Sequence, residues 1–159
     1  MTEVLARDIL MRARDRGVTV TTAESCTGGM VSAALTDVAG SSDIFHRGVV
    51  TYSNAAKQEM LGVHAETLSV HGAVSEEVVR EMAEGARRAA EADFAVAVSG
   101  VAGPGGSEQK PEGMVCFALA RDGETLTETV EFGALGRANV RMAATHHALE
   151  LLHDALAED

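Results

Sequence analysis

The sequence predicts an α/β fold, a three-layer α/β/α sandwich around a mostly parallel mixed sheet with one antiparallel strand. Predicted strands and helices alternate along the chain. The strands are short apolar runs or runs of alternating polarity, and the helices are longer segments whose apolar residues recur at helical spacing. The run at 93–99 is almost continuously apolar, which is typical of a strand buried on both faces of a parallel sheet. The turn signal at 121–124, between two strand-like runs, predicts a hairpin and hence the antiparallel strand.

The first half of the chain contains two strand–helix units. The residues from Val18 to Thr21 alternate between apolar and β-branched polar types, which predicts a strand. Asn54 is a suitable N-cap for a short helix. In chain order, we expect a helix at 2–16, a strand at 18–22, a helix at 28–38, a loop at 39–43, a strand at 47–52 and a helix at 55–61.

The second half adds a long helix, the apolar central strand and the hairpin. Ser75 followed by Glu76 and Glu77 is a good helix start, because acidic side chains suit the positive end of the helix dipole. The expected elements after this helix are a strand at 93–99, a glycine loop at 100–106, strands at 114–120 and 125–132, and a long helix from Gly136 onward.

Length and composition predict one domain, spanning residues 1–159, and leave a small anionic ligand possible if several Arg side chains converge. The net charge of −11 argues against binding to nucleic acid or to anionic membranes, because both need basic patches. The sequence has no run of 18 apolar residues, and its N-terminus does not resemble a signal peptide. Two cysteines do not form a disulfide framework. We therefore expect a cytoplasmic protein.

Lysine is scarce, and its two positions are informative. The thirteen basic residues comprise eleven Arg and two Lys, and both Lys57 and Lys110 lie in or beside segments rich in Gly, Ser or Asn. A guanidinium stays protonated and cannot act as a general base, whereas a buried lysine can lose its proton near neutral pH. Lys57 is therefore a candidate base, and chance placement of the two lysines is the alternative.

Ser25 is the candidate nucleophile. It lies between the first strand and the helix that follows Gly28 and Gly29, where unpaired backbone N–H groups can hold a developing oxyanion. Ser25 with an unprotonated Lys57 forms a Ser–Lys nucleophile pair. The alternative is that Ser25 only caps the helix. Cys26 is a second candidate, because a helix start lowers the pKa of a thiol, but no His lies in these segments to serve as its base.

Three polar segments are expected to meet at one edge of the sheet. Ligands of an open α/β sheet bind at the carboxyl ends of the strands, which here lead into Ser25, into Tyr52 to Lys57 and into Ser99 to Gly106. The glycine loop lacks the Gly-Lys-Ser/Thr ending of an NTPase loop. Its N–H groups can still wrap a phosphate or a ribose, and a plain connection between strands is the alternative.

Other charged residues allow two interpretations each. Arg137 and Arg141 are four residues apart and share one face of the last helix, so they form either a phosphate clamp or an ordinary solvated face. Glu24 either orients Ser25 for catalysis or has a purely structural role. The six His residues form no metal-binding pattern, so no metal site is predicted.

Together these motifs resemble the CinA C-terminal domain family. The resembling segments occur in the same order along nearly the whole chain. They are Ala23 to Gly29, Gly48 to Asn54 with Lys57, Leu61 to Val63, His71 to Ser75, Ser99 to Gly106, and Gly136 to Arg141. The stretch 107–113, which contains Lys110, departs from the family pattern. We expect none of the activity of the second domain that often precedes this one.

The resemblance implies a nicotinamide mononucleotide deamidase, which hydrolyses the carboxamide to nicotinic acid mononucleotide and ammonia. It implies a homodimer, no metal or redox cofactor, and a Ser25–Lys57 pair assisted by Tyr52. The candidate substrate-binding residues are Cys26, Thr27, Gly28, Gly29, Asn54, Ser99, Gly103, Gly105, Gly106, Arg137 and Arg141. The alternatives are a catalytically silent nucleotide-binding module of the same fold and an amidase for another amide.

Overall fold

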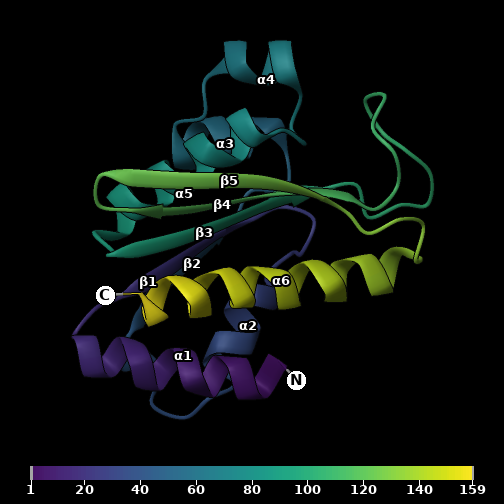
Figure 1. The fold of residues 1–159 in the computed structure, drawn as a ribbon. Helices are drawn as coiled ribbons and strands as arrows, with labels where there is room; N and C mark the ends of the chain where they lie inside the picture. The colour runs from purple at the N-terminus through teal and green to yellow at the C-terminus, as the bar shows by residue number, and fades with distance from the viewer. Residues whose placement is uncertain (1, 159) are drawn as a thin grey trace.

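The computed structural model describes residues 2–158 and contains a five-stranded sheet in the order β2-β1-β3-β4-β5 (Figure 1). β1 pairs in parallel with β2 and β3, whereas β4 is antiparallel to both β3 and β5. One strand therefore opposes the other four, as predicted. The strands are β1 (Val20–Glu24), β2 (Phe45–Val50), β3 (Phe94–Gly100), β4 (Met114–Arg121) and β5 (Glu124–Glu131).

Helices cover both faces of the sheet and confirm the predicted three layers. α1, α2 and α6 pack on one face, while α3, α4 and α5 pack on the other (Figure 1). The helices are α1 (Thr2–Arg16), α2 (Met30–Thr36), α3 (Asn54–Leu61), α4 (Ala65–His71), α5 (Glu76–Ala90) and α6 (Arg137–Ala157), with a 3-10 turn at Ser41–Asp43. Across residues 2–158, no helix combines the length and apolar character needed to cross a membrane.

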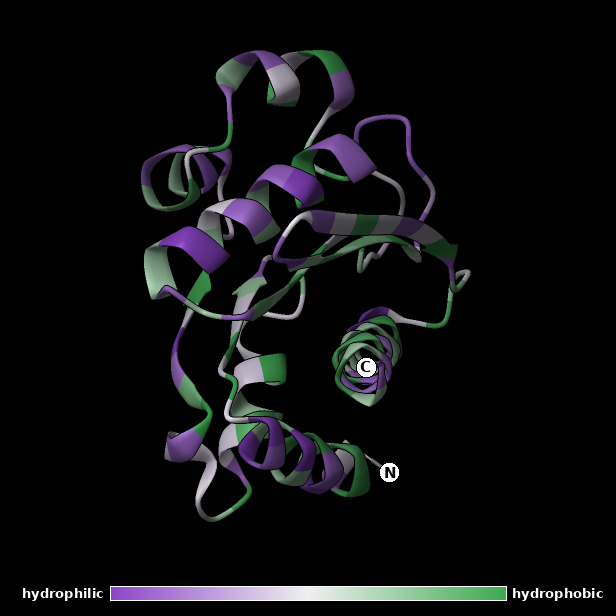
Figure 2. Ribbon diagram, turned by 60° about the vertical axis from the view of Figure 1, so that its left-hand side comes forward, coloured by the Kyte–Doolittle hydropathy of each residue, from purple (hydrophilic) through white to green (hydrophobic). Residues whose placement is uncertain are grey.

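The central strand β3 separates two apolar cores. Phe94, Val96 and Val98 belong to the core under α1, α2 and α6, whereas Ala95 and Ala97 belong to the core under α5. All five side chains are buried, as expected for a strand with helices on both faces. Figure 2 shows hydrophobic segments along the inner strands and mixed stripes along the covering helices.

Two strand boundaries differ from the prediction. β1 begins and ends two residues later than predicted, because the N–H of Val18 bonds back to the carbonyl of Ala13 (3.0 Å) and closes α1. β2 begins and ends two residues earlier than predicted. The shift of β1 places Ser25 immediately after the strand, so the residue is held by the sheet.

The caps of two helices were predicted with mixed success. Ser53, and not Asn54, caps α3, because its Oγ accepts a hydrogen bond from the N–H of Ala56 at 3.0 Å. Asn54 is instead the first residue of the helix. Ser75 caps α5 as predicted, with its Oγ accepting from the N–H of Val78 at 3.2 Å.

The position of α3 depends on a close contact with α5. A Cβ atom on Gly85 of α5 would lie 1.9 Å from the carbonyl oxygen of Leu61, so only glycine permits this approach. Leu61 ends α3, which also carries Lys57. The contact therefore sets how closely the helix and its lysine lie against the rest of the fold.

Candidate active site

The carboxyl ends of β1, β2 and β3 meet at one edge of the sheet, where a cleft of about 340 Å³ opens. The three polar segments that were predicted to converge do lie together there. The predicted site residues that line the cleft are Ser25, Cys26, Tyr52, Asn54, Lys57, Ser99, Gly103, Gly105, Gly106 and Arg137. The other four, Thr27, Gly28, Gly29 and Arg141, lie outside its lining.

Ser25 and Lys57 are in direct contact at the base of this cleft. The Nζ atom of Lys57 lies 3.0 Å from the Oγ atom of Ser25, within the range for proton transfer between side chains. The end of β1 presents Ser25, whose N–H donates to the carbonyl of Val98 at 2.9 Å. Lys57 comes from the first turn of α3. The fold thus joins two residues that are 32 positions apart in the sequence.

The amine of Lys57 is held by main-chain carbonyl groups. The side chain is 1% exposed, and Nζ donates to the carbonyls of Thr51 at 2.8 Å and Tyr52 at 3.3 Å. Burial lowers the pKa of Lys57 below its ordinary 10.5, because removal from water disfavours the charged form. The negative charge of Glu108 opposes this lowering of the pKa only in part. The amine of Lys57 therefore loses its proton more readily than that of an exposed lysine.

Glu24 organises the turn between β1 and α2. Its buried carboxylate accepts five hydrogen bonds of 2.6 to 3.2 Å, from the hydroxyl groups of Thr27 and Ser32 and from the N–H groups of Gly29, Val31 and Ser32. The carboxylate also suits the positive end of the α2 dipole. Of its two possible roles, the structural one is therefore observed. The side chain that satisfies the start of α2 belongs to Glu24, so the candidate nucleophile is not a helix cap.

The backbone N–H groups of the turn are less available to a ligand than predicted. The N–H of Gly28 donates to the carbonyl of Ser25 at 3.1 Å, and that of Gly29 donates to the Glu24 carboxylate at 3.2 Å. Both glycines have positive φ angles, of 57° and 107°, which is a backbone conformation that favours glycine. Within residues 2–158, the N–H of Cys26 makes no backbone hydrogen bond, and Cys26 lines the cleft.

Arg141 holds the same turn from α6 and does not reach the cleft. Its Nε donates to the carbonyl of Cys26 at 3.0 Å, and its Nη2 lies 3.4 Å from the carbonyl of Thr27. A Cβ atom on Gly28 would lie 3.0 Å from this guanidinium. The two guanidinium groups proposed as a clamp thus bind different parts of the chain, and only Arg137 lines the cleft.

Arg137 lies at the mouth of the cleft. Its Nη1 donates to the carbonyl of Gly103 at 2.6 Å, and its Nη2 donates to the hydroxyl of Tyr52 at 2.9 Å. Tyr52 is 59% exposed, whereas Lys57 is buried. These contacts join the start of α6 to the loops after β2 and β3. Both acceptors of Arg137 are uncharged, so its positive charge remains available to an anion.

Cys26 does not have the properties of a nucleophile. Burial raises the pKa of its thiol to about 11, so the thiol is protonated near neutral pH. The predicted lowering by a helix start is absent, because α2 begins only at Met30 and the N–H groups of Val31 and Ser32 bind Glu24. No His is among the cleft residues. Across residues 2–158, no group of three or more His, Cys, Asp or Glu side chains is placed to hold a metal ion.

Lys110 supports a wall of the cleft. Its Nζ donates to the carbonyls of His71, at 2.6 Å, and Val74. The nearby carboxylate of Glu108 accepts from the N–H of Ala73 at 3.2 Å and lines the cleft. These contacts tie the loop between β3 and β4 to the connection between α4 and α5. Sequence reasoning missed Glu108, and only the family's segment from His71 to Ser75 hinted that this connection borders the site.

Comparison with known proteins places the chain in one family. The model of the CinA C-terminal domain matches residues 2–156. The nicotinamide-nucleotide amidohydrolase PncC of Escherichia coli (strain K12) is 56% identical over 150 residues, which cover 93% of this chain and 90% of that protein. A CinA-like protein of Syntrophobacter fumaroxidans is 48% identical over 158 residues, which cover 99% of this chain and 37% of that longer protein.

Solved structures agree in fold and in sequence. The competence/damage inducible protein CihA from Agrobacterium tumefaciens superposes with a TM-score of 0.94 at 48% identity, covering 99% of this chain and 96% of that one. The competence damage-inducible protein A of Klebsiella pneumoniae superposes with a TM-score of 0.95 at 44% identity, covering 99% and 98%. The chain therefore belongs to the CinA C-terminal domain family.

Proposed function

We propose that the protein is an amidohydrolase that converts nicotinamide mononucleotide to nicotinic acid mononucleotide and ammonia, with Ser25 as nucleophile and Lys57 as general base. The observation that carries this proposal is the 3.0 Å contact between the Ser25 hydroxyl and a buried lysine whose pKa is lowered. The names of the E. coli, Shigella flexneri and Enterobacter agglomerans relatives support the substrate class.

The hydrogen bonds of Lys57 suit both protonation states that a general base must adopt. A neutral amine has two N–H groups and one lone pair. The carbonyls of Thr51 and Tyr52 accept the two N–H groups, which leaves the lone pair for the hydroxyl proton of Ser25. The geometry is therefore complete for a neutral Lys57 that accepts this proton. After transfer, the ammonium still has three acceptors, namely the two carbonyls and the serine oxygen.

The reaction then follows in two stages. Ser25 Oγ attacks the carboxamide carbon while Lys57 takes the hydroxyl proton, which gives a tetrahedral oxyanion. The carbon–nitrogen bond breaks, and Lys57 returns the proton to the leaving nitrogen, so ammonia departs. Water next attacks the acyl ester with Lys57 as base, and the proton returns to Ser25 Oγ as the carboxylic acid leaves. We assign the oxyanion to the N–H of Cys26, in place of the occupied N–H groups of Gly28 and Gly29.

Arg137 is the residue that we assign to the phosphate of the nucleotide. It lines the cleft and binds only uncharged acceptors, the Gly103 carbonyl and the Tyr52 hydroxyl. A phosphate would supply charged acceptors in the geometry that a guanidinium prefers. Asn54, Ser99 and the loop from Gly103 to Gly106 also line the cleft and provide polar surface for the ribose and the pyridine ring.

Ammonia release from nicotinamide mononucleotide tests the proposal directly. Wild type, Ser25→Ala and Cys26→Ala are assayed side by side, with nucleotide binding measured by calorimetry. We expect wild type and Cys26→Ala to release ammonia and Ser25→Ala to lose at least about 10³-fold in kcat, as for other nucleophile replacements. Binding without release by wild type would instead indicate a silent nucleotide-binding module, and full activity of Ser25→Ala would exclude Ser25 as nucleophile.

A further inference from the structure

The turn that carries Ser25 is held between two opposite charges. On one side, the Glu24 carboxylate accepts the N–H groups of Gly29 and Val31. On the other side, the Arg141 guanidinium donates to the carbonyls of Cys26 and Thr27. The carboxylate and the guanidinium therefore bind complementary main-chain groups of one short segment. Glu24 lies within that segment, whereas Arg141 reaches it from α6, more than 110 residues later.

The hydrogen bonds of Arg141 fix the direction of a neighbouring N–H group. In a trans peptide, the C=O and the following N–H point in opposite directions. By binding the Thr27 carbonyl, Arg141 orients the peptide whose N–H belongs to Gly28, and that N–H donates to the Ser25 carbonyl at 3.1 Å. The held Ser25 carbonyl then sets the direction of the N–H of Cys26. Cys26 is the turn residue next to Ser25 and lines the cleft.

We infer that Arg141 is a positioning residue, which presets the Ser25 hydroxyl and the N–H of Cys26 for attack and for oxyanion binding. This inference rests on the proposed Ser25–Lys57 chemistry, but it does not depend on which amide is the substrate. It separates the two arginines of α6, since Arg137 lines the cleft and Arg141 acts through the turn. Arg141 therefore affects the rate of reaction at Ser25 and not the affinity for a nucleotide.

A substrate-independent probe tests this inference. An alkyl fluorophosphonate forms a phosphorus–oxygen bond to an activated serine as fluoride leaves, and Lys57 takes the hydroxyl proton. The rate of labelling, read by intact mass, is compared for wild type, Ser25→Ala, Arg141→Met and Arg141→Lys. Arg80→Met is the matched control, because Arg80 also donates to a main-chain carbonyl, that of Thr125 at 3.0 Å, but lies away from the cleft.

We expect Arg141→Met to slow labelling by roughly 10²-fold, the loss typical of a small misplacement of reacting groups. Arg141→Lys keeps the charge but cannot span both carbonyls, so we expect an intermediate loss. Arg80→Met should label within about threefold of wild type. The pH at which the labelling rate is half-maximal should be unchanged in Arg141→Met, because the contacts of Lys57 are intact. Thermal unfolding identifies any variant that is not folded, and Arg141→Lys then provides the comparison.

Equal labelling of wild type and Arg141→Met would overturn the inference, and so would a shifted pH midpoint, which would indicate general collapse of the site. Failure of wild-type Ser25 to label would also overturn it, since the turn would not be preset. If wild type labels but releases no ammonia from nicotinamide mononucleotide, the proposed substrate is wrong while the labelling series still decides the role of Arg141. With that substrate, kcat should fall in Arg141→Met, and KM should stay within about threefold of wild type.

Discussion

A lysine acts as a base near neutral pH only if its surroundings disfavour the ammonium form. At Lys57, burial has this effect, and the negative charge of Glu108 opposes it only in part. The scarcity of lysine indicated a candidate catalytic residue at position 57 but not at position 110. Lys110 binds two carbonyls at the edge of a loop and lies outside the cleft lining, so its amine serves the structure.

Lys57→Arg should reduce kcat/KM for ammonia release by at least about 10³-fold at every pH, because a guanidinium stays protonated and cannot accept the serine proton. Lys110→Arg is the matched control, and it should retain most of the activity because a guanidinium can also donate to the carbonyls of His71 and Val74. Steady-state kinetics of both variants measure the difference. Comparable losses in the two variants would show that the special role of Lys57 is wrong.

The pH dependence of the wild-type reaction should be set by the protonation of Lys57. Protonation of Lys57 removes the base, so kcat/KM falls as the pH drops through its pKa. Burial places that pKa below the ordinary 10.5, so the acid limb of the profile should lie below pH 10.5. An acid limb near the ordinary lysine value would contradict a neutral amine in the free enzyme.

At the scale of elements, the site depends on how α2 begins. The first N–H groups of most helices bind a cap or water. In α2, the N–H of Met30 donates to the carbonyl of Thr27, and those of Val31 and Ser32 donate to the fully buried Glu24. The same side chain ends β1 and begins the turn that presents Ser25. A strand, a turn and a helix therefore share one carboxylate, and loss of its charge should loosen all three.

Glu24→Gln should lower the free energy of unfolding by about 3 kcal/mol, because an amide nitrogen cannot accept the bonds from Ser32 and leaves buried donors unpaired. Ser75→Ala, which removes an ordinary N-cap from α5, should cost only about 1 kcal/mol. Urea unfolding of both variants at pH 7 gives the comparison. A smaller loss for Glu24→Gln than for Ser75→Ala would contradict the role assigned to the carboxylate.

The sequence was sufficient to predict the order of the elements, because the continuous apolar runs of β3 and β4 and the helical spacing of α6 are clear. It also predicted which three strand ends meet. The ends of β1 were misplaced because Glu24, a charged residue, continues the strand, and its five hydrogen bonds come from residues that no periodicity relates to it. For the same reason, Arg141 was assigned to a ligand although its acceptors are main-chain carbonyls.

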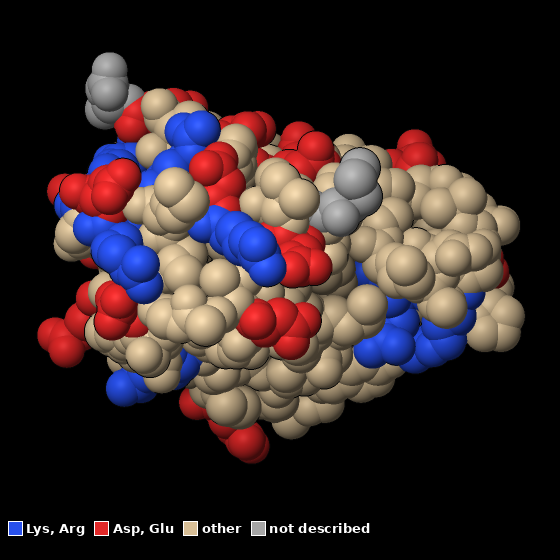
Figure 3. Space-filling model, turned by 90° about the horizontal axis from the view of Figure 1, so that it is seen from below, with Lys and Arg blue, Asp and Glu red and all other residues tan. Residues whose placement is uncertain are grey.

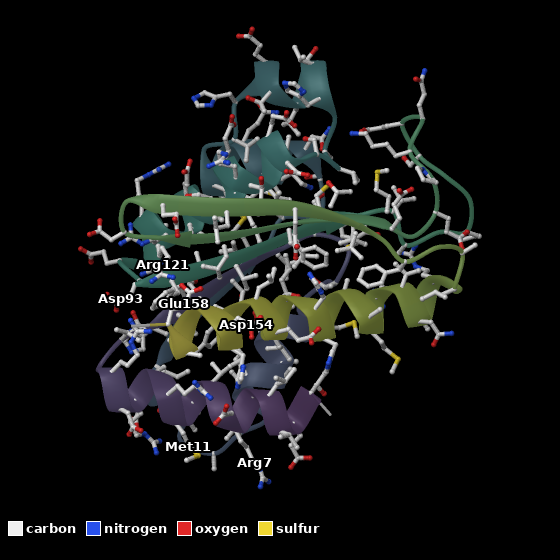
Figure 4. All side chains as sticks on the ribbon, viewed as in Figure 1. Arg7, Met11, Asp93, Arg121, Asp154 and Glu158 are labelled. Atoms are coloured by element: carbon white, nitrogen blue, oxygen red, sulfur yellow. The ribbon has the colours of Figure 1, made fainter. Side chains whose placement is uncertain are left out.

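At the scale of the whole molecule, many exposed charges are paired with neighbours. Figure 3 shows acidic and basic side chains interspersed over the face that contains α1, where Arg7 and Glu3 lie 2.7 Å apart. Figure 4 shows Arg121 and Glu158 together at the end of the sheet opposite the loop between β3 and β4, at a distance of 2.6 Å. Exposed pairs of this kind each contribute about 0–1 kcal/mol to stability.

A less exposed carboxylate links the helical layer to the edge of the sheet. Glu76 in α5 accepts hydrogen bonds from Thr127 and Thr129 of β5, both at 2.8 Å. Bonds from Thr129 and Thr127 lower the pKa of Glu76 below its ordinary 4.5. Between the lowered pKa of the folded state and the ordinary pKa of the unfolded state, the unfolded chain binds more protons at Glu76 than the folded chain does. The stability that Glu76 contributes is therefore fully present above pH 4.5. It is lost as the pH falls through the lowered pKa.

Glu76→Gln should therefore be less stable than wild type by about 1 kcal/mol at pH 7, and the difference should shrink toward zero at pH 3.5. Urea unfolding at both pH values measures it. Glu124→Gln, at an exposed position of β5, should change stability by less than about 0.5 kcal/mol at either pH. A constant difference between wild type and Glu76→Gln across this range would show that the carboxylate charge does not matter.

The two carbonyl groups that hold the amine of Lys57 have a consequence for how this site tolerates genetic change. Both acceptors belong to the main chain of Thr51 and Tyr52, so no single amino-acid replacement deletes either of them. The two hydrogen bonds to the amine therefore depend on the backbone path at positions 51 and 52 and not on the side chains there. A functional Lys57 therefore requires the lysine itself and the backbone conformation of residues 51 and 52, rather than particular partner side chains.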